Sequence, residues 1–249
     1  MKTARSWKGR LRRRIVEARG PKLQRDELRP GIVSFTFDDF PQSAYRTGGR
    51  ILEEAGVRGT YYAAMSASQP DPQRAAFVRE DLQRLLHEGH ELGCHTFSHL
   101  DCSATPIREV LRDVERNAKA VEEALGEQLV SFAYPKGRLA GSAKARLSRI
   151  FATCRGIKPG INRACIDLAH LHANNLYSDA APIERARALI QDVASGGGWL
   201  LFYTHDVDEH PSRFGSNPRD LSKTLELALE AGCRVLPVRS ALGALAFEG

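Results

Sequence analysis

From residue 31 onward, short runs of apolar and β-branched residues alternate with longer segments of helical period. This alternation is typical of parallel strands joined by crossover helices, so it predicts an α/β fold. The helical segments, several of them ended by a glycine, are expected at residues 42–55, 77–88, 106–125, 183–194 and 222–231. The expected strands are Ile32–Phe37, Gly59–Ala63, Glu91–Gly93, Ser131–Tyr134, Ala152–Arg155, Trp199–Thr204 and Arg234–Pro237.

The length of 249 residues fits one α/β barrel, a fold that takes about 250 residues. A domain boundary is expected near Arg29-Pro30-Gly31, with a basic N-terminal arm at residues 1–30 and a single domain at residues 31–249. No apolar run approaches the roughly 20 residues that a membrane-spanning helix needs, so we expect no transmembrane segment.

The net charge of +6 is located in the arm, because the first 25 residues hold ten Lys and Arg residues and one acid, Glu17. Such an arm could bind an anionic membrane surface or simply be solvated. Proteins that bind single-stranded nucleic acid place several aromatic residues among their basic residues, whereas this arm has only Trp7. No nucleic-acid partner is therefore expected. The segment Leu11–Val16 is not the apolar run of a signal peptide. Cytoplasmic residence is expected, peripheral to the inner membrane if residues 1–25 bind anionic lipid.

Three of the expected strands end in residues that can do chemistry. Asp38 and Asp39 follow the first strand, His95 and His99 follow the third, and His205 follows the strand Trp199–Thr204. The carboxyl ends of parallel strands meet at one edge, which favours a shared site. Each feature alone has an ordinary alternative: a loop or N-cap role for the aspartates, and surface, capping or structural roles for the histidines.

Two histidines and one aspartate make a three-ligand metal site with an open position. His95 and His99 would lie on one face if their segment turned helically. Zinc is the expected ion, and cobalt, nickel or manganese would fit the same ligands. A catalytic metal lowers the pKa of a bound water from about 15.7 towards 7. His205 could protonate a leaving amine, because the ordinary pKa of histidine is near 6.5.

Four motifs together resemble the polysaccharide deacetylases with a NodB homology domain, which are similar to carbohydrate esterase family 4. They are TFDD at 36–39, HTFSH at 95–99, FAYPKG at 132–137 and YTHD at 203–206, and the resemblance covers roughly residues 31–238. It implies a distorted, incomplete (β/α)7–8 barrel. It also makes Asp38 the general base, Asp39, His95 and His99 the metal ligands, and His205 the general acid.

The resemblance implies that the metal-dependent enzyme hydrolyses the N-acetyl group of an amino sugar of the N-acetylglucosamine type and releases acetate. The substrate would be a bacterial surface polysaccharide or its lipid-linked or oligosaccharide precursor. The metal and a backbone N–H near Lys136 would hold the oxyanion. A hydrolase of another linear or cyclic amide and a catalytically silent glycan-binding barrel stay open as alternatives.

The chain departs from the family pattern at the third motif. The family commonly carries Arg two residues before the proline and an aromatic residue after it, where this chain has Ala133 and Lys136. The Arg that would hold the base must therefore come from elsewhere. Arg155, at the end of the strand Ala152–Arg155, is the candidate, and a surface Arg is the alternative.

The tryptophan-containing fourth motif of the family is not visible either. The carboxylate expected to orient His205 is therefore unassigned, with Asp167 and Asp179 as candidates. Tyr134 is a candidate to line the sugar site, with a buried core tyrosine as the alternative.

Overall fold

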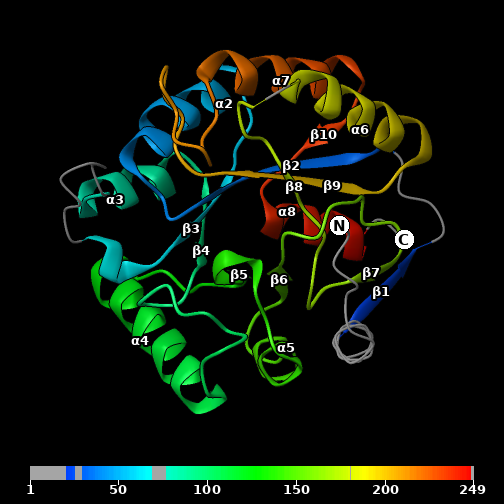
Figure 1. The fold of residues 1–249 in the computed structure, drawn as a ribbon. Helices are drawn as coiled ribbons and strands as arrows, with labels where there is room; N and C mark the ends of the chain where they lie inside the picture. The colour runs from blue at the N-terminus through cyan, green and yellow to red at the C-terminus, as the bar shows by residue number, and fades with distance from the viewer. Residues whose placement is uncertain (1–20, 26–29, 69–76, 180, 248–249) are drawn as a thin grey trace, which may run out of the picture.

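The expected strands form one curled, all-parallel sheet in the computed structural model (Figure 1), which describes residues 21–25, 30–68, 77–179 and 181–247. The strand order is β6-β5-β4-β3-β2-β9-β8, with β10 beside β2. A single-residue bridge between Arg155 and Leu171 brings the two ends of the sheet together, which makes an incomplete barrel. The expected α/β fold is therefore confirmed. The strands are β2 (Ile32–Asp38), β3 (Thr60–Ala63), β4 (Glu91–Cys94), β5 (Ser131–Ala133), β6 (Thr153–Arg155), β8 (Asn174–Asn175), β9 (Trp199–Thr204) and β10 (Arg234–Val235).

Helices surround the sheet, and the five expected helical segments are all present (Figure 1). The first expected segment begins as a π-helical turn. The long helix α4 is followed by Gly126, whose φ of 70° suits a residue without a side chain. These elements are η1 (Ala44–Gly49), α2 (Arg50–Glu54), α3 (Arg79–His87), α4 (Ile107–Leu125), α6 (Pro182–Gly196) and α7 (Pro218–Glu230). Elements that the periodicity did not predict are η2 (Met65–Ser68), η3 (Pro135–Gly137), α5 (Gly141–Leu147), α8 (Val238–Phe247), β1 (Lys22–Arg25), β7 (Ala164–Asp167) and the two-residue strand β8.

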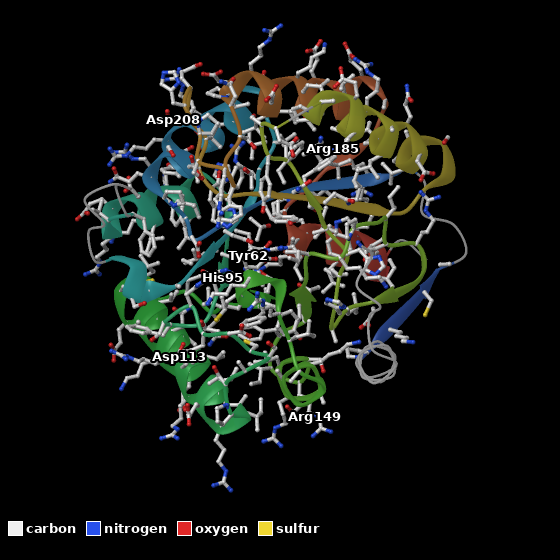
Figure 2. All side chains as sticks on the ribbon, in the orientation of Figure 1. Tyr62, His95, Asp113, Arg149, Arg185 and Asp208 are labelled. Atoms are coloured by element: carbon white, nitrogen blue, oxygen red, sulfur yellow. The ribbon has the colours of Figure 1, made fainter. Side chains whose placement is uncertain are left out.

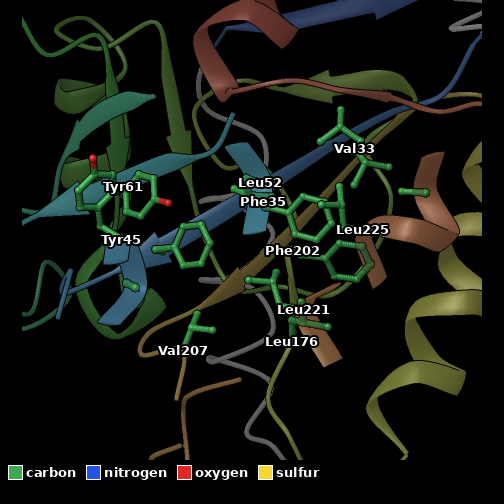
Figure 3. Close-up of a cluster of buried hydrophobic side chains, with 14 of the residues drawn as sticks. Val33, Phe35, Tyr45, Leu52, Tyr61, Leu176, Phe202, Val207, Leu221 and Leu225 are labelled. Carbon is green, nitrogen blue, oxygen red and sulfur yellow. The ribbon is translucent and has the colours of Figure 1, made fainter. Parts of the chain in front are cut away.

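The strands are buried on both faces, as parallel strands in an α/β fold usually are. On the outer face Phe35 of β2 stacks on Phe202 of β9, with ring centroids 5.7 Å apart, against Leu221 and Leu225 of α7 (Figure 3). On the inner face Trp199 belongs to a second cluster that α8 supplies with Val238, Ala241 and Leu245. Helix α8 therefore fills one end of the barrel and leaves the carboxyl ends of the strands for chemistry.

The basic arm meets the domain through a short strand. Strand β1 (Lys22–Arg25) pairs antiparallel with β7. Residues 1–20 lie outside the described residues, so the boundary near residue 30 and the membrane association of the arm stay predictions. Within the described ranges, the helices are too short or too polar to cross a membrane.

Candidate metal centre at the carboxyl ends of the strands

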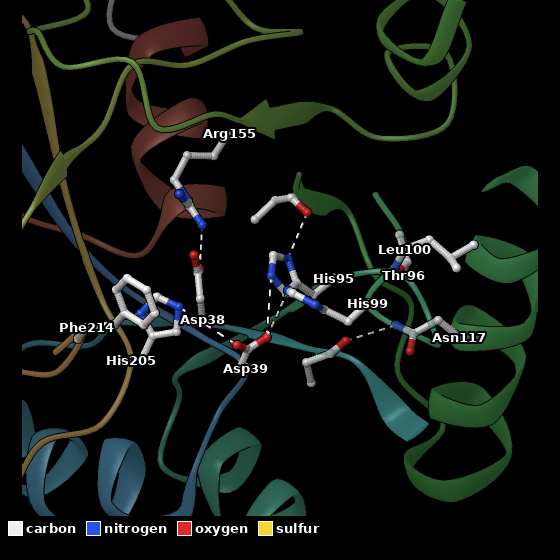
Figure 4. Close-up of polar contacts among 12 residues, drawn as sticks. Asp38, Asp39, His95, Thr96, His99, Leu100, Asn117, Arg155, His205 and Phe214 are labelled. Carbon is white, nitrogen blue, oxygen red and sulfur yellow. Dashed lines mark hydrogen bonds and ion pairs between the residues drawn. The ribbon is translucent and has the colours of Figure 1, made fainter. Parts of the chain in front are cut away.

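Five side chains from three strand ends meet at one point in the structure (Figure 4). Oδ1 of Asp39 lies 3.7 Å from Nε2 of His95 and 3.3 Å from Nε2 of His99. Its other oxygen lies 3.8 Å from Nε2 of His205, and Asp38 is the neighbouring residue on β2. The structure thus brings together the residues that the strand-end argument placed at one edge. His95 is buried and is labelled near the centre of the view in Figure 2, whereas Asp208 lies towards its edge.

The two adjacent aspartates point in different directions because the chain leaves the strand between them. Asp38 is the last residue of β2 and is buried, whereas Asp39 has a φ of 58° and turns its carboxylate towards the rim. Phe40 follows with a φ of 46°, a costly conformation for a bulky residue. Its fully buried ring packs on Phe77 and Tyr61 at 5.1 and 5.2 Å, and this packing holds the turn in place.

The two histidines of the HTFSH motif meet although their segment does not form a helical turn. Thr96 and His99 have φ values of 60° and 52°, so the loop doubles back and brings the rings to 5.0 Å. Nδ1 of His95 lies 2.8 Å from the carbonyl oxygen of Ala133, so this nitrogen carries the proton and Nε2 keeps its lone pair. Burial lowers the pKa of His95 to about 4 against the opposing effect of the nearby aspartates, so the ring is neutral near pH 7.

Helix α4 anchors this loop through one carboxylate. Asp113 accepts hydrogen bonds from the backbone N–H groups of Phe97 and Ser98, both at 2.8 Å, and from the Ser98 hydroxyl at 3.0 Å. Asn117, one turn further along, accepts from the N–H of Met65 at the start of η2. The sequence argument missed both residues, because nothing in an amphipathic helix distinguishes a loop anchor from a solvated polar residue.

We expect Asp113→Ala to weaken Zn²⁺ binding by about 10- to 100-fold, the usual effect of removing a group that orients metal ligands. The loop would lose three hydrogen bonds at once, and His99 would lose its fixed position. Calorimetric zinc titration of the purified protein measures this, with Glu109→Ala as the control, since Glu109 lies exposed one turn earlier on α4. Equal affinity in Asp113→Ala and Glu109→Ala would contradict the anchoring role.

The donor atoms fit a metal ion. Single ligand atoms of Asp39, His95 and His99 all lie within 4.8 Å of one another. Two donors about 2.0–2.1 Å from one ion at a tetrahedral angle would be roughly 3.3–3.4 Å apart, close to the spacings between Asp39 and the two histidines. Imidazole and carboxylate donors suit zinc and also cobalt, nickel and manganese. In the part of the chain that the structure describes, this is the one such cluster found.

Arg155 lies against Asp38, so the candidate arginine does come from β6. Its Nη2 donates to Oδ1 of Asp38, and both side chains are buried. The guanidinium lies between the rings of Tyr62 and Tyr203, 5.1 and 5.2 Å from their centroids. Burial alone would raise the pKa of Asp38, but the charge of Arg155, with His95 nearby, holds this pKa below its ordinary value. Asp38 is therefore an ionised carboxylate at neutral pH.

The partner of His205 differs from the expectation. Its Nδ1 faces the carbonyl oxygen of Phe214 at 3.2 Å. Asp167 instead pairs with the buried Lys144, and Asp179 pairs with Arg185 at 2.6 Å. The idea that one of these two carboxylates orients His205 was wrong, because both belong to other ion pairs.

Tyr134 does not line the site. The alternation of β5 turns Ser131 and Ala133 towards the barrel interior and sends Phe132 and Tyr134 outwards. Tyr134 is 1% exposed, and its hydroxyl donates to the carbonyl of Ala169 at 3.1 Å, so it is a core residue. Lys136 is exposed on η3 beside the end of β5, with a φ of 57°. A role for the N–H near Lys136 in holding an oxyanion stays a prediction.

The sequence of this chain is similar to the sequences of known deacetylases. A family model described as polysaccharide deacetylase matches residues 25–150. A chitooligosaccharide deacetylase of Sinorhizobium fredii is 30% identical over 99 residues, which cover 39% of this chain and 43% of that protein. The matched chain spans less than half of the length of the curated relatives.

Solved structures resemble the fold over almost the whole chain. A family 4 acetyl xylan esterase from Clostridium thermocellum, in complex with a cobalt ion, has a TM-score of 0.61 at 18% identity and covers 85% of this chain and 90% of its own. A pseudoenzyme of carbohydrate esterase family 4 from Bacillus anthracis has a TM-score of 0.59 at 14% identity, covering 88% of this chain and 68% of its own. At these identities the likeness shows the fold, an incomplete barrel.

Proposed function

Because the chain belongs to the polysaccharide deacetylase family, we propose that it hydrolyses the N-acetyl group of an amino-sugar glycan with the help of a divalent metal. Asp39, His95 and His99 would hold that metal. The observation that carries this proposal is a buried, ionised Asp38, fixed by Arg155, directly beside a His-His-Asp donor set. A buried ion pair that only stabilised the fold would not need to lie beside a cluster of possible metal ligands.

In this proposal, different residues of the chain carry out different steps of the amide hydrolysis. Asp38 accepts the proton of the attacking water, and Arg155 keeps that carboxylate ionised and fixed. His205, once its ring carries a proton on Nε2 as well as on Nδ1, gives the Nε2 proton to the sugar nitrogen as the C–N bond breaks, so that acetate and the free amine leave. A bound divalent metal supplies polarisation of the acetamide oxygen and acidification of water.

For the substrate we propose a glycan of the N-acetylglucosamine type, in a bacterial surface polysaccharide or its lipid-linked or oligosaccharide precursor. The chitooligosaccharide deacetylase among the relatives supports an oligosaccharide. Zinc is the proposed ion. Cytoplasmic residence, and attachment of the arm to an anionic membrane, likewise stay proposals.

We expect the zinc-loaded protein to release acetate from N-acetylglucosamine oligomers, and a chelator to abolish the release. His99→Ala removes one donor and should reduce the rate at least about 10²-fold, the lower range for losing metal assistance or proton transfer. His210→Ala, in an exposed loop after β9, is the matched control and should keep the rate. The assay measures acetate enzymatically over a series of oligomer lengths.

Two other outcomes would redirect the proposal. Release from acetylated xylan or a cyclic imide, with none from the sugar amides, would change the substrate class. Silence on every substrate would favour the catalytically silent glycan-binding barrel, an alternative that the pseudoenzyme fold neighbour keeps in view. Five intact residues argue against silence, since a barrel that only binds glycan has no chemical need for all of Asp38, Asp39, His95, His99 and His205.

A further inference from the structure

We propose that the main-chain carbonyl of Phe214 orients His205, and that Asp206 is the positioning residue that keeps this carbonyl in place. The inference rests on the proposed function, in which His205 is the general acid. In this arrangement a neutral backbone carbonyl, held by the loop that follows β9, takes the place of the carboxylate that was expected to orient His205.

The carbonyl oxygen of Phe214 collects three donors. It accepts from the backbone N–H of His205 at 3.1 Å, and it lies 3.2 Å from Nδ1 of the same residue and 3.2 Å from the hydroxyl of Thr204. Because a carbonyl oxygen only accepts, Nδ1 must carry its proton. The other nitrogen, Nε2, is thereby directed at the metal centre, 3.8 Å from Asp39.

The loop that returns Phe214 to His205 is closed by the carboxylate of Asp206. One oxygen of Asp206 accepts from the N–H of Ser212 at 2.6 Å, and the other accepts from the Ser212 hydroxyl. The carbonyl of Ser212 in turn accepts from the N–H of Gly215 at 2.8 Å. A Cβ atom on Gly215 would lie 2.6 Å from the Asp206 carboxyl carbon, so this contact between Asp206 and the loop requires glycine at position 215. Both oxygens of Asp206 are thus committed to the loop that carries Phe214.

The aromatic rings around His205 limit its rotation. The Phe214 ring lies 5.4 Å from the imidazole centroid and the Tyr177 ring 6.1 Å from it, while these two rings contact each other at 5.7 Å. Figure 4 shows Phe214 directly beside the imidazole. The rings restrict the plane of His205, and the hydrogen bond to the carbonyl of Phe214 favours the proton on Nδ1.

The first test reads the tautomer of His205 by long-range ¹H–¹⁵N NMR on the zinc-loaded full chain, labelled at histidine and assigned with His205→Gln. We expect the Nδ1–H form in the native protein, a mixture of tautomers in Asp206→Ala, and a largely preserved Nδ1–H form in Asp206→Asn, since Asn can keep one bond to Ser212. Asp208→Ala is the matched control, because Asp208 is exposed in the same loop and its side chain accepts from the N–H of His210, away from Phe214 and Ser212. An Nε2–H form in the native protein, or an unchanged tautomer in Asp206→Ala, would overturn the inference.

The second test compares an amide with an ester that has a good leaving group. An amine must be protonated as it leaves, whereas 4-nitrophenolate leaves 4-nitrophenyl acetate without help. Asp206→Ala should lower kcat for N-acetylglucosamine oligomers about 10- to 100-fold at unchanged KM, part of the 10²–10⁴ that acid–base groups contribute, and leave ester cleavage within about twofold. Equal losses on both substrates would mean general damage and sink the positioning role. If the native protein releases no acetate, the proposed function fails, while the NMR result still decides the orientation of His205.

Discussion

Asp38→Asn should reduce acetate release by about 10²–10⁴-fold in kcat while leaving zinc affinity within a factor of about three, because a general base contributes this much. Asn has almost the same shape and can still accept from Arg155, so the packing at the end of β2 is kept. It cannot take a proton from water. Steady-state kinetics on N-acetylglucosamine oligomers, beside calorimetric zinc titration, measure both quantities on the same preparations.

Measuring kcat and zinc affinity together distinguishes the roles of the two adjacent aspartates. Asp39→Asn should weaken zinc binding, since Asp39 lies nearest to both histidines. If Asp38→Asn lost zinc and Asp39→Asn did not, the assignment of base and ligand would have to be exchanged. If Asp38→Asn kept full activity, the base would be another group.

The arrangement of the strands could be predicted from the sequence because each inner strand is a short apolar run between clear stops. Strands β1, β7 and β8 were not predicted, and the last two show why. Strand β7 has only four residues, two of them exposed, and β8 consists of two asparagines, so neither forms the longer apolar run of a buried strand. They form because neighbouring strands offer them backbone partners, which is tertiary information.

The site was predictable to the extent that it follows from topology. Side chains at the carboxyl ends of parallel strands must converge, and this argument also reaches Arg155, because alternation along β6 turns Thr153 and Arg155 inwards and Cys154 outwards. The partner of His205 was not predictable in this way. A backbone carbonyl such as that of Phe214 leaves no residue type to recognise, although Asp206, in the YTHD motif, was a visible signal.

Arg155→Met should destabilise the protein by about 3–5 kcal/mol, because removing one partner of a buried ion pair leaves the other charge without compensation. The group left without a partner is the Asp38 carboxylate, which lies 5% exposed beside the candidate metal ligands. For a chain of this size the loss should lower Tm by roughly 6–20 °C. Chemical and thermal unfolding of the full chain measure it. Arg185→Met is the control, since Arg185 pairs with Asp179 at the surface, where such pairs contribute about 0–1 kcal/mol.

The double variant Asp38→Asn/Arg155→Met decides whether the loss comes from charge or from packing. Removing both charges should recover a large part of the stability, because two apolar or neutral groups of similar volume avoid the cost of a lone buried charge. A double variant as unstable as Arg155→Met would instead assign the loss to the packing of the guanidinium between Tyr62 and Tyr203. Recovery without activity would mean that this ion pair is kept for the chemistry of Asp38, since the fold is stable without it.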